Sequence, residues 1–307
     1  DVTKMKSMVS FSGCSKLLAV PYLDYQAATS GTSRFSNCAS LQKMPHLNIP
    51  LVASIVGMFS GCTSLKSVRD INAPKATSIG TLFNGCTSLV NAPSITAPLC
   101  TAASRMFAGC SSLKTVGELY LPAATDISYC FHQCVALEEA PKIGAPVCTN
   151  AQYLFAECER LKKVTELNLP KAGMSYAFTA CDALRTVKMV CAGVGTTSSY
   201  NTFNTCYNLV DLEIEFHGGG GYVGPFYRAM RRCILTSGSG TAPSGWPARM
   251  DFCDTGISRP EAVELFQKIP TTTRTSARLN FSTTPAAADL TDEDIAIVVA
   301  KGWAVST

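Results

Sequence analysis

The chain has 307 residues, of which only 16% are charged, and its formal net charge of +4 is too small to indicate a nucleic-acid partner. Arg228, Arg231 and Arg232 form one local basic cluster, a pattern more typical of a solvated surface than of a phosphate site. No run of apolar residues approaches the roughly 18 that a membrane-spanning helix needs. Composition therefore excludes nucleic-acid-binding and membrane-spanning proteins.

A motif of the form Phe-x-x-Cys-x-x-Leu recurs along most of the sequence. The step between motifs is 24 residues from Phe11 to Phe155, 23 residues from Phe155 to Phe178 and 25 residues from Phe178 to Phe203. A fixed period in the range of about 20 to 50 residues indicates a solenoid, because one repeat cannot bury its apolar side alone and must stack on the next. The nine motifs begin at Phe11, Phe35, Phe59, Phe83, Phe107, Phe131, Phe155, Phe178 and Phe203.

Within each repeat, the apolar residues predict a strand followed by a short helical return. Phe59, Cys62 and Leu65 lie three residues apart, which suits a short helical or 3₁₀ turn with one inward face. The segment 119–121 alternates as a short strand does, and Pro122 ends it because proline cannot donate to a ladder. We therefore expect a curved solenoid with short parallel strands on one face and 3₁₀ or short helical turns on the other.

The 15 cysteines follow the repeat rather than a disulfide framework. Nine of them occupy the Cys position of the motif, while Cys100, Cys148 and Cys130 stand where other repeats have small or medium apolar residues. This alternation indicates buried thiols that act as small hydrophobes. Neighbouring side chains in a parallel ladder point the same way and nine is an odd number, so we expect these thiols to be free.

After Phe203 the pattern decays, and the sequence predicts three regions within one continuous solenoid. The region 1–216 forms nine repeats of about 24 residues each. The region 217–247 forms an irregular Gly-rich connection. The region 248–307 forms helix-containing repeats and a cap, because the segment 249–255 is similar to the later segment 278–284.

Two helices are predicted in this C-terminal region. Ser258 and Glu261 have the spacing of a capping box before a helix over 262–268. A similar start at Thr291 predicts a final helix that ends by Gly302. We expect that helix, with Trp303 behind it, to cover the open end of the sheet, since solenoids need such caps for solubility.

The repeat resembles a known family. The run Ile79-Gly80-x-x-Phe83-x-x-Cys86-x-Ser88-Leu89, followed by Pro98, resembles the BspA-like leucine-rich repeats of bacterial surface proteins, and the C-terminal pair resembles their closing segment in gut anaerobes. The resemblance covers roughly residues 8–216 and implies a leucine-rich repeat solenoid. It also implies an exported, often lipid-anchored, surface protein of a gut bacterium, and some such proteins are adhesins. The repeat here is one residue longer than the commonest form of that family, with the extra residue around 69–70 or 117–118.

Catalytic and metal sites find little support in the sequence. The three histidines, His46, His132 and His217, occupy different repeats and different repeat positions. The group of Cys130, His132 and Cys134 lacks the second Cys pair of a usual zinc site. The segment His217-Gly218-Gly219-Gly220 lacks the Gly-x-Ser-x-Gly elbow that esterases carry. We therefore predict no enzyme activity, no metal and no cofactor.

The outward positions of the strands form the candidate binding surface. Their Asn, Tyr and charged residues suit contact with a protein or a glycan, although such residues occur on any solvated sheet. The predicted site on this face consists of Asn72, Glu118, Tyr120, Glu166 and Asn168.

These observations predict a non-enzymatic, monomeric adhesin that recognises a host or bacterial macromolecule, protein or glycan, through its sheet face. We expect it to be exported, either secreted or held at the cell surface, and to meet a membrane only through an upstream lipid anchor. The alternative is a structural spacer in a larger surface assembly. We also expect that residues upstream of Asp1 have been removed, whether a signal peptide, an anchor or an N-terminal cap.

Overall fold

A computed structural model describes residues 9–20, 25–44, 46–191, 202–206, 208–216, 222–223, 232–237, 249–252, 257–269, 271 and 277–307. The chain forms two compact units, Asp1–Arg160 (unit 1) and Leu161–Thr307 (unit 2).

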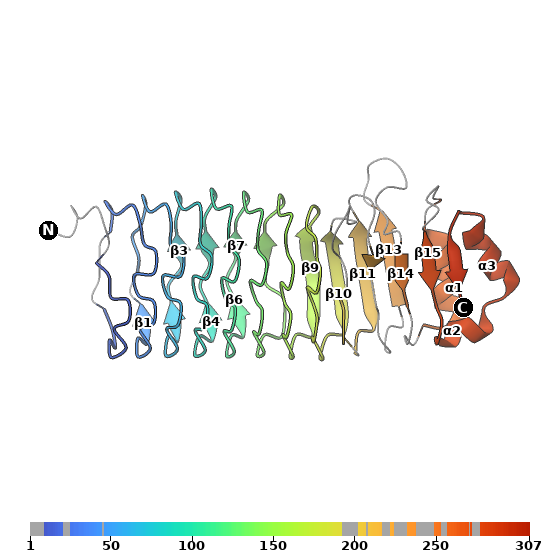
Figure 1. The fold of residues 1–307 in the computed structure, drawn as a ribbon, viewed down its shortest axis with the longest axis horizontal. Coiled ribbons are helices and arrows are strands. Elements are labelled where there is room, and N and C mark those ends of the chain that lie inside the picture. The colour runs from blue at the N-terminus through green and yellow to red at the C-terminus, as the bar shows by residue number, and fades with distance from the viewer. Residues whose placement is uncertain are drawn as a thin grey trace. The chain divides into compact units, whose positions relative to one another are not determined.

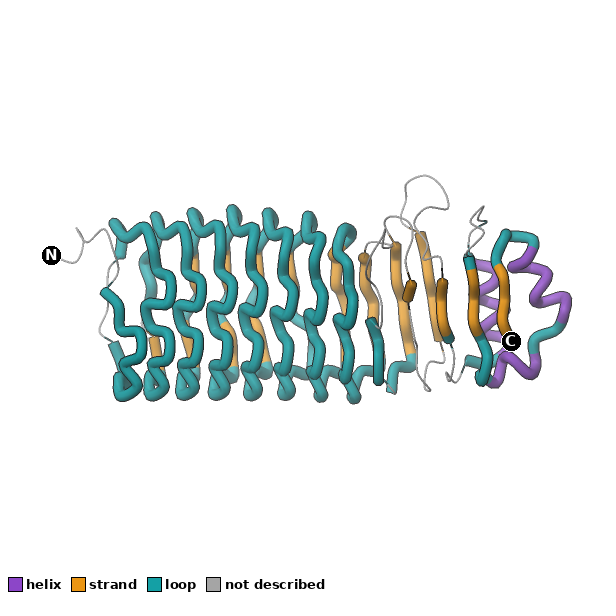
Figure 2. The backbone as a smooth tube through the Cα atoms, in the orientation of Figure 1, coloured by secondary structure: helices purple, strands orange, loops and turns teal. Residues whose placement is uncertain are grey.

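Unit 1 is a stack of coils, each of which is one repeat of the sequence (blue to green in Figure 1). Successive coils are joined by three parallel ladders, and in Figure 2 the strands lie behind the turns that face the viewer. The first ladder consists of β1 (Lys43–Met44), β2 (Ser67–Val68), β4 (Asn91–Ala92) and β6 (Thr115–Val116). The second consists of β3 (Ile71–Asn72), β5 (Ile95–Thr96), β7 (Leu119–Tyr120) and β8 (Ile143–Gly144). The third is a row of single bridges through Ser54, Ser78, Ala102, Asp126 and Asn150.

Phenylalanine rings run through the core of unit 1 as one continuous stack. From Phe11 to Phe155, neighbouring ring centroids are 5.2–5.6 Å apart and their planes lie within 12° of parallel. All of these rings from Phe35 onwards are fully buried. Each ring is therefore covered by its own equivalents in the coils before and after it, which is why the motif repeats with so little variation.

The motif segments form turns that are tied to the next coil. As expected from the three-residue spacing, the N–H of Cys86 donates to the carbonyl of Phe83 at 3.0 Å. However, Thr81 and Gly85, two residues before and after Phe83, have φ angles of 52° and 71°, in the left-handed region. The N–H groups of Phe83 and Gly85 donate to carbonyls of the next coil, each at 2.8 Å. The leucine-rich repeat solenoid is confirmed, but its return segments are stacked turns, because left-handed residues interrupt a 3₁₀ helix.

The strands of unit 1 are short because each coil is interrupted in the middle of its strand face. Pro93 lies between β4 and β5 and has no N–H for a ladder. The next N–H, of Ser94, is satisfied by the Oδ1 of Asp70 at 2.8 Å. In the following coil, Gly117 passes so close that a Cβ there would lie 2.4 Å from the Ser94 nitrogen. This close approach is a physical reason for glycine at position 117, where the other repeats without proline have Arg69 and Thr165.

In unit 2 the corresponding strands are continuous, and neither these strands nor the strands with which they pair in this sheet contain proline. One parallel sheet has the order β13 (Arg232–Ser237), β11 (Asp211–Phe216), β10 (Thr186–Cys191) and β9 (Lys163–Leu169). Between β9 and β10 the register shifts by one residue, so that Thr165 and Glu166 face Lys188 alone. This bulge is at the repeat position of residues 69–70 and 117–118, where the sequence placed the extra residue of the longer repeat.

A second parallel sheet of unit 2 has the order β12 (Tyr222–Val223), β14 (Arg249–Asp251), β15 (Arg278–Asn280) and β16 (Ala304–Ser306). The predicted similarity of the segments at 249 and 278 is confirmed, because β14 and β15 pair in register. The interval 217–247, predicted to be irregular, contains β12 and β13. Its remaining residues, including His217 and the glycines after it, lie outside the described part of the chain.

The helices are α1 (Arg259–Lys268), α2 (Pro285–Asp289) and α3 (Asp292–Val299). Both predicted N-termini are confirmed: Glu261 accepts from the Ser258 N–H at 2.7 Å, and Thr291 and Asp294 bond reciprocally. One expectation is wrong, because the exposed edge of β15 is not covered by the last helix. The chain continues past α3 and adds β16 to that edge (Figure 1). Trp303, just before β16, is buried.

Candidate functional site

The strand face of unit 1 presents three of the five predicted site residues. Asn72 pairs with Thr96, which pairs with Tyr120, so Asn72 and Tyr120 lie two strands apart, about 9.6 Å at the usual spacing. Their strand neighbours point inward and are buried. Glu118, just before β7, is also exposed. These positions thus form an outward array that spans three coils, with Thr96 on the coil between Asn72 and Tyr120.

Tyr120 is the prominent side chain of this array. It is 49% exposed, although it is large and partly apolar. Gly144 stands opposite it on the next strand, and a Cβ at Gly144 would lie 3.8 Å from the Cδ2 atom of Tyr120. The ring therefore lies beside a position that carries no side chain, which leaves its flank accessible. Exposed aromatic residues of this kind are favoured anchors in protein interfaces.

The other two predicted residues, Glu166 and Asn168, belong to β9 in unit 2. They line a hollow of about 180 Å³ (hollow 2), which extends over the strand face of β9, β10 and β11. A second hollow of about 220 Å³ (hollow 1) lies earlier along the same strands and includes Asp211. Lys188 and Glu213 line both hollows, and their Nζ and Oε1 atoms are 2.9 Å apart. The ion pair therefore separates the two hollows.

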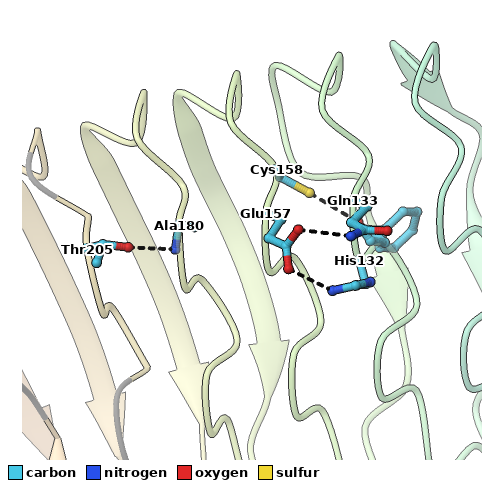
Figure 3. Close-up of polar contacts among 7 residues, drawn as sticks. His132, Gln133, Glu157, Cys158, Ala180 and Thr205 are labelled. Carbon is cyan, nitrogen blue, oxygen red and sulfur yellow. Dashed lines mark hydrogen bonds and ion pairs between the residues drawn. The ribbon is translucent and has the colours of Figure 1, made fainter.

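The turn side of unit 1 carries a polar cluster that the sequence reasoning missed. The carboxylate of Glu157 points toward two side chains of the preceding coil (Figure 3). Its Oε1 lies 3.2 Å from the Nε2 of His132, and its Oε2 accepts from the Nε2 of Gln133 at 2.9 Å. His132 is thus engaged with a carboxylate and not with the neighbouring cysteines.

An aromatic column continues this cluster. The guanidinium carbon of Arg105 lies 4.2 Å from the ring centroid of Tyr129, and the Tyr129 ring stacks on Tyr153 with centroids 4.6 Å apart. His132 meets the edge of Tyr129 at 5.7 Å. The sequence could have predicted this column, because Arg105, Tyr129 and Tyr153 are spaced by one repeat and therefore stack. The ring faces of Tyr129 are occupied within the protein, so the cluster stabilises the stacking of coils.

The motif cysteines have a structural role. The carbonyl of Phe59 accepts both the N–H of Cys62 and the thiol of Cys86, each at 3.1 Å. The same thiol contact recurs along the column, for example from Cys158 to the coil before it (Figure 3). Burial raises the pKa of the Cys62 thiol to about 12. Cysteine suits this column because it fills a small apolar space and still donates to a carbonyl.

The thirteen cysteines whose side chains the structure describes are thiols and form no disulfide, as predicted. The prediction that the motif column is buried holds with one exception, since Cys14 is exposed and no described coil covers its outer side. Within the described residues, no group of three or more His, Cys, Asp or Glu side chains is arranged to hold a metal ion. None of the described helices has the length and apolar character required to span a membrane.

Stacked coils of one repeat each, with a parallel strand face, define a leucine-rich repeat solenoid. The family model described as BspA type leucine rich repeat region matches in six copies, over residues 2–114, 35–140 and 125–217. The chain therefore belongs to the BspA type leucine rich repeat family. Proteins of this family are usually exported or surface proteins of bacteria, commonly engaged in protein interaction, and typically non-enzymatic scaffolds.

Solved structures with weaker similarity are also leucine-rich repeat proteins. The T. pallidum leucine rich repeat protein is 20% identical, with 54% of this chain and 73% of that chain covered and a TM-score of 0.35. A leucine-rich repeat protein from Bacteroides ovatus is 16% identical, with 87% and 77% covered and a TM-score of 0.21. No curated protein sequence gives a significant match.

Proposed function

We propose that this protein is a non-enzymatic adhesin that recognises a host or bacterial macromolecule, protein or glycan, through its strand face. It acts as a monomer, without a cofactor, secreted or held at the surface of a gut bacterium by an upstream lipid anchor. The observation that carries the proposal is the exposed array of Asn72, Glu118 and Tyr120 on the strand face of unit 1, with an accessible aromatic ring among polar groups. Aromatic residues contribute most to binding energy at such surfaces.

The test begins with two ligand sources, host extracellular matrix proteins and an array of bacterial glycans. For the ligand that binds, affinity is measured for the parent protein and for Tyr120→Ala. We expect Tyr120→Ala to weaken binding by more than about 1 kcal/mol. The same change should alter the free energy of unfolding by no more than about 0.5 kcal/mol, because the side chain is exposed.

Leu99→Ala is the matched control, because Leu99 is also 49% exposed but lies in a turn after Pro98 rather than on a strand. It should leave affinity unchanged. If Tyr120→Ala and Glu118→Gln both bind as the parent does, the strand face of unit 1 is not the site. The alternative function, a structural spacer, predicts that neither source yields a ligand.

A further inference from the structure

The two hollows on the strand face of unit 2 have a regular spacing. The outward residues of β10 are Thr186, Lys188 and Val190, and hollow 1 extends from Thr186 to Lys188 whereas hollow 2 extends from Lys188 to Val190. Two residues of a parallel strand rise about 6.6 Å, so the centres of the hollows are about that far apart. An extended polypeptide places its side chains i and i+2 at the same distance on one face.

Each hollow is small and has partly apolar walls. Their volumes of about 220 and 180 Å³ are below the roughly 300–1,000 Å³ of a small-molecule site. The lining includes Val187 and Leu212 in hollow 1 and Leu167 and Met189 in hollow 2, but these inward residues are at most 4% exposed. The open apolar surface is therefore that of the outward residues of β10, namely Thr186, Val190 and the aliphatic stem of Lys188. Each hollow therefore suits one long side chain, and the aliphatic stem of a lysine or arginine packs well on such walls.

The lining of each hollow has more negative than positive charges. Lys188 pairs with Glu213, which leaves the carboxylate of Asp211 in hollow 1 and that of Glu166 in hollow 2. Within the part of the chain that the structure describes, neither carboxylate has an ion-pair partner. Among the residues that line it, each hollow thus carries one negative charge beyond the Lys188–Glu213 pair, although the whole chain has a formal net charge of +4. Attraction of a cation is therefore local to these hollows rather than general to the protein.

Building on the proposed binding role of the strand face, we infer that hollows 1 and 2 bind an extended segment of a partner protein that carries lysine or arginine at alternate positions. The segment lies along β10 and straddles the Lys188–Glu213 pair. One basic head reaches Asp211 and the next, two residues along, reaches Glu166.

The probe is a synthetic peptide, Thr-Lys-Thr-Lys-Thr-amide, whose α-amino group is acylated by a fluorophore. The control peptide has the same composition with adjacent lysines, so only the spacing of the charges differs. Binding to the full chain is measured by fluorescence anisotropy at low ionic strength. We expect the alternating peptide to bind about twofold to fivefold more tightly, because only it brings a second cation to a second surface carboxylate. Added salt should remove this preference.

Variants locate the contacts. Glu166→Gln and Asp211→Asn should each weaken binding of the alternating peptide about twofold to fivefold, and together they should abolish the preference between peptides. Glu159→Gln is the matched control, because it removes one exposed carboxylate from a turn outside the hollows and should change nothing. Equal binding of the two peptides, or a preference that survives in the double variant, would overturn the inference.

The peptide experiment and the Tyr120→Ala experiment can fail independently of each other. If Tyr120→Ala weakens binding of the macromolecular ligand while the two peptides bind equally well, the basic segment is refuted and the strand-face function stands. If the peptide behaves as expected while Tyr120→Ala has no effect, the hollows are a binding site and the array in unit 1 is not.

Discussion

The motif thiols should be nearly inert toward alkylation in the folded protein. Cys62 is fully buried, its thiol donates to the Phe35 carbonyl at 3.0 Å, and burial raises its pKa from the ordinary 9.0 to about 12. Only the thiolate reacts, and at pH 8 a thiol with a pKa of 12 carries about a thousandfold less thiolate than one with a pKa of 9. Exclusion of the reagent from the core slows the reaction further.

Iodoacetamide labelling at pH 8, followed by peptide mass spectrometry, measures this directly. We expect exposed Cys14 to react first and Cys62 at least about a thousandfold more slowly. A Cys14→Ser variant should lose the fast phase, which serves as the control. In denaturant without reductant, every thiol of the column should then become alkylated, because all of them are free.

Two results would refute the reasoning. Rapid labelling of Cys62 in the folded protein would mean that the coils open readily or that the column is not buried. Resistance of most column cysteines to alkylation in denaturant without reductant would mean that they are oxidised, and the parallel ladder geometry would then be wrong.

Three further predictions concern stability. Below pH 9 the buried thiols are protonated in the folded and the unfolded state, whereas between pH 9 and 12 they ionise only in the unfolded chain, so the free energy of unfolding should fall over that range. Urea titrations monitored by circular dichroism should show this fall, and Cys62→Ala should make it shallower. The Nζ of Lys301 donates to the carbonyls of Phe266, Gln267 and Ile269 at 2.9–3.0 Å, so Lys301→Met should lower the free energy of unfolding, measured by thermal unfolding, by about 1.5–3 kcal/mol. Lys268→Met breaks one surface ion pair and should lower it by less than about 1 kcal/mol. Equal losses would argue against the cap at the end of α1. Deletion of residues 289–307 removes β16 and uncovers the edge of β15, so the product should be insoluble or oligomeric on size-exclusion chromatography, and a monomer with an unchanged melting temperature would contradict this role of β16.

Much of unit 1 could be read from the sequence because the fold repeats one pattern. When residues one repeat apart stack, a column in the alignment of repeats is a row of contacts in space. The burial of the Phe83 column, the free thiols beside it and the outward position of Tyr120 all follow from that correspondence. The capping boxes at Ser258 and Thr291 were also readable, since they depend on residues only three apart.

Other features were decided by contacts that no single repeat contains. The left-handed backbone at Thr81 arises because its coil must both turn and bond to the next coil. The bulge at Thr165–Glu166 exists only against the shorter strand β10, and the hollows beside it need side chains from three strands. The strand β16 was missed because it is short and gains its stability from pairing with β15. Periodicity therefore determined which residues face the core, whereas pairing between coils of unequal length determined where the surface is hollowed and how the sheet ends.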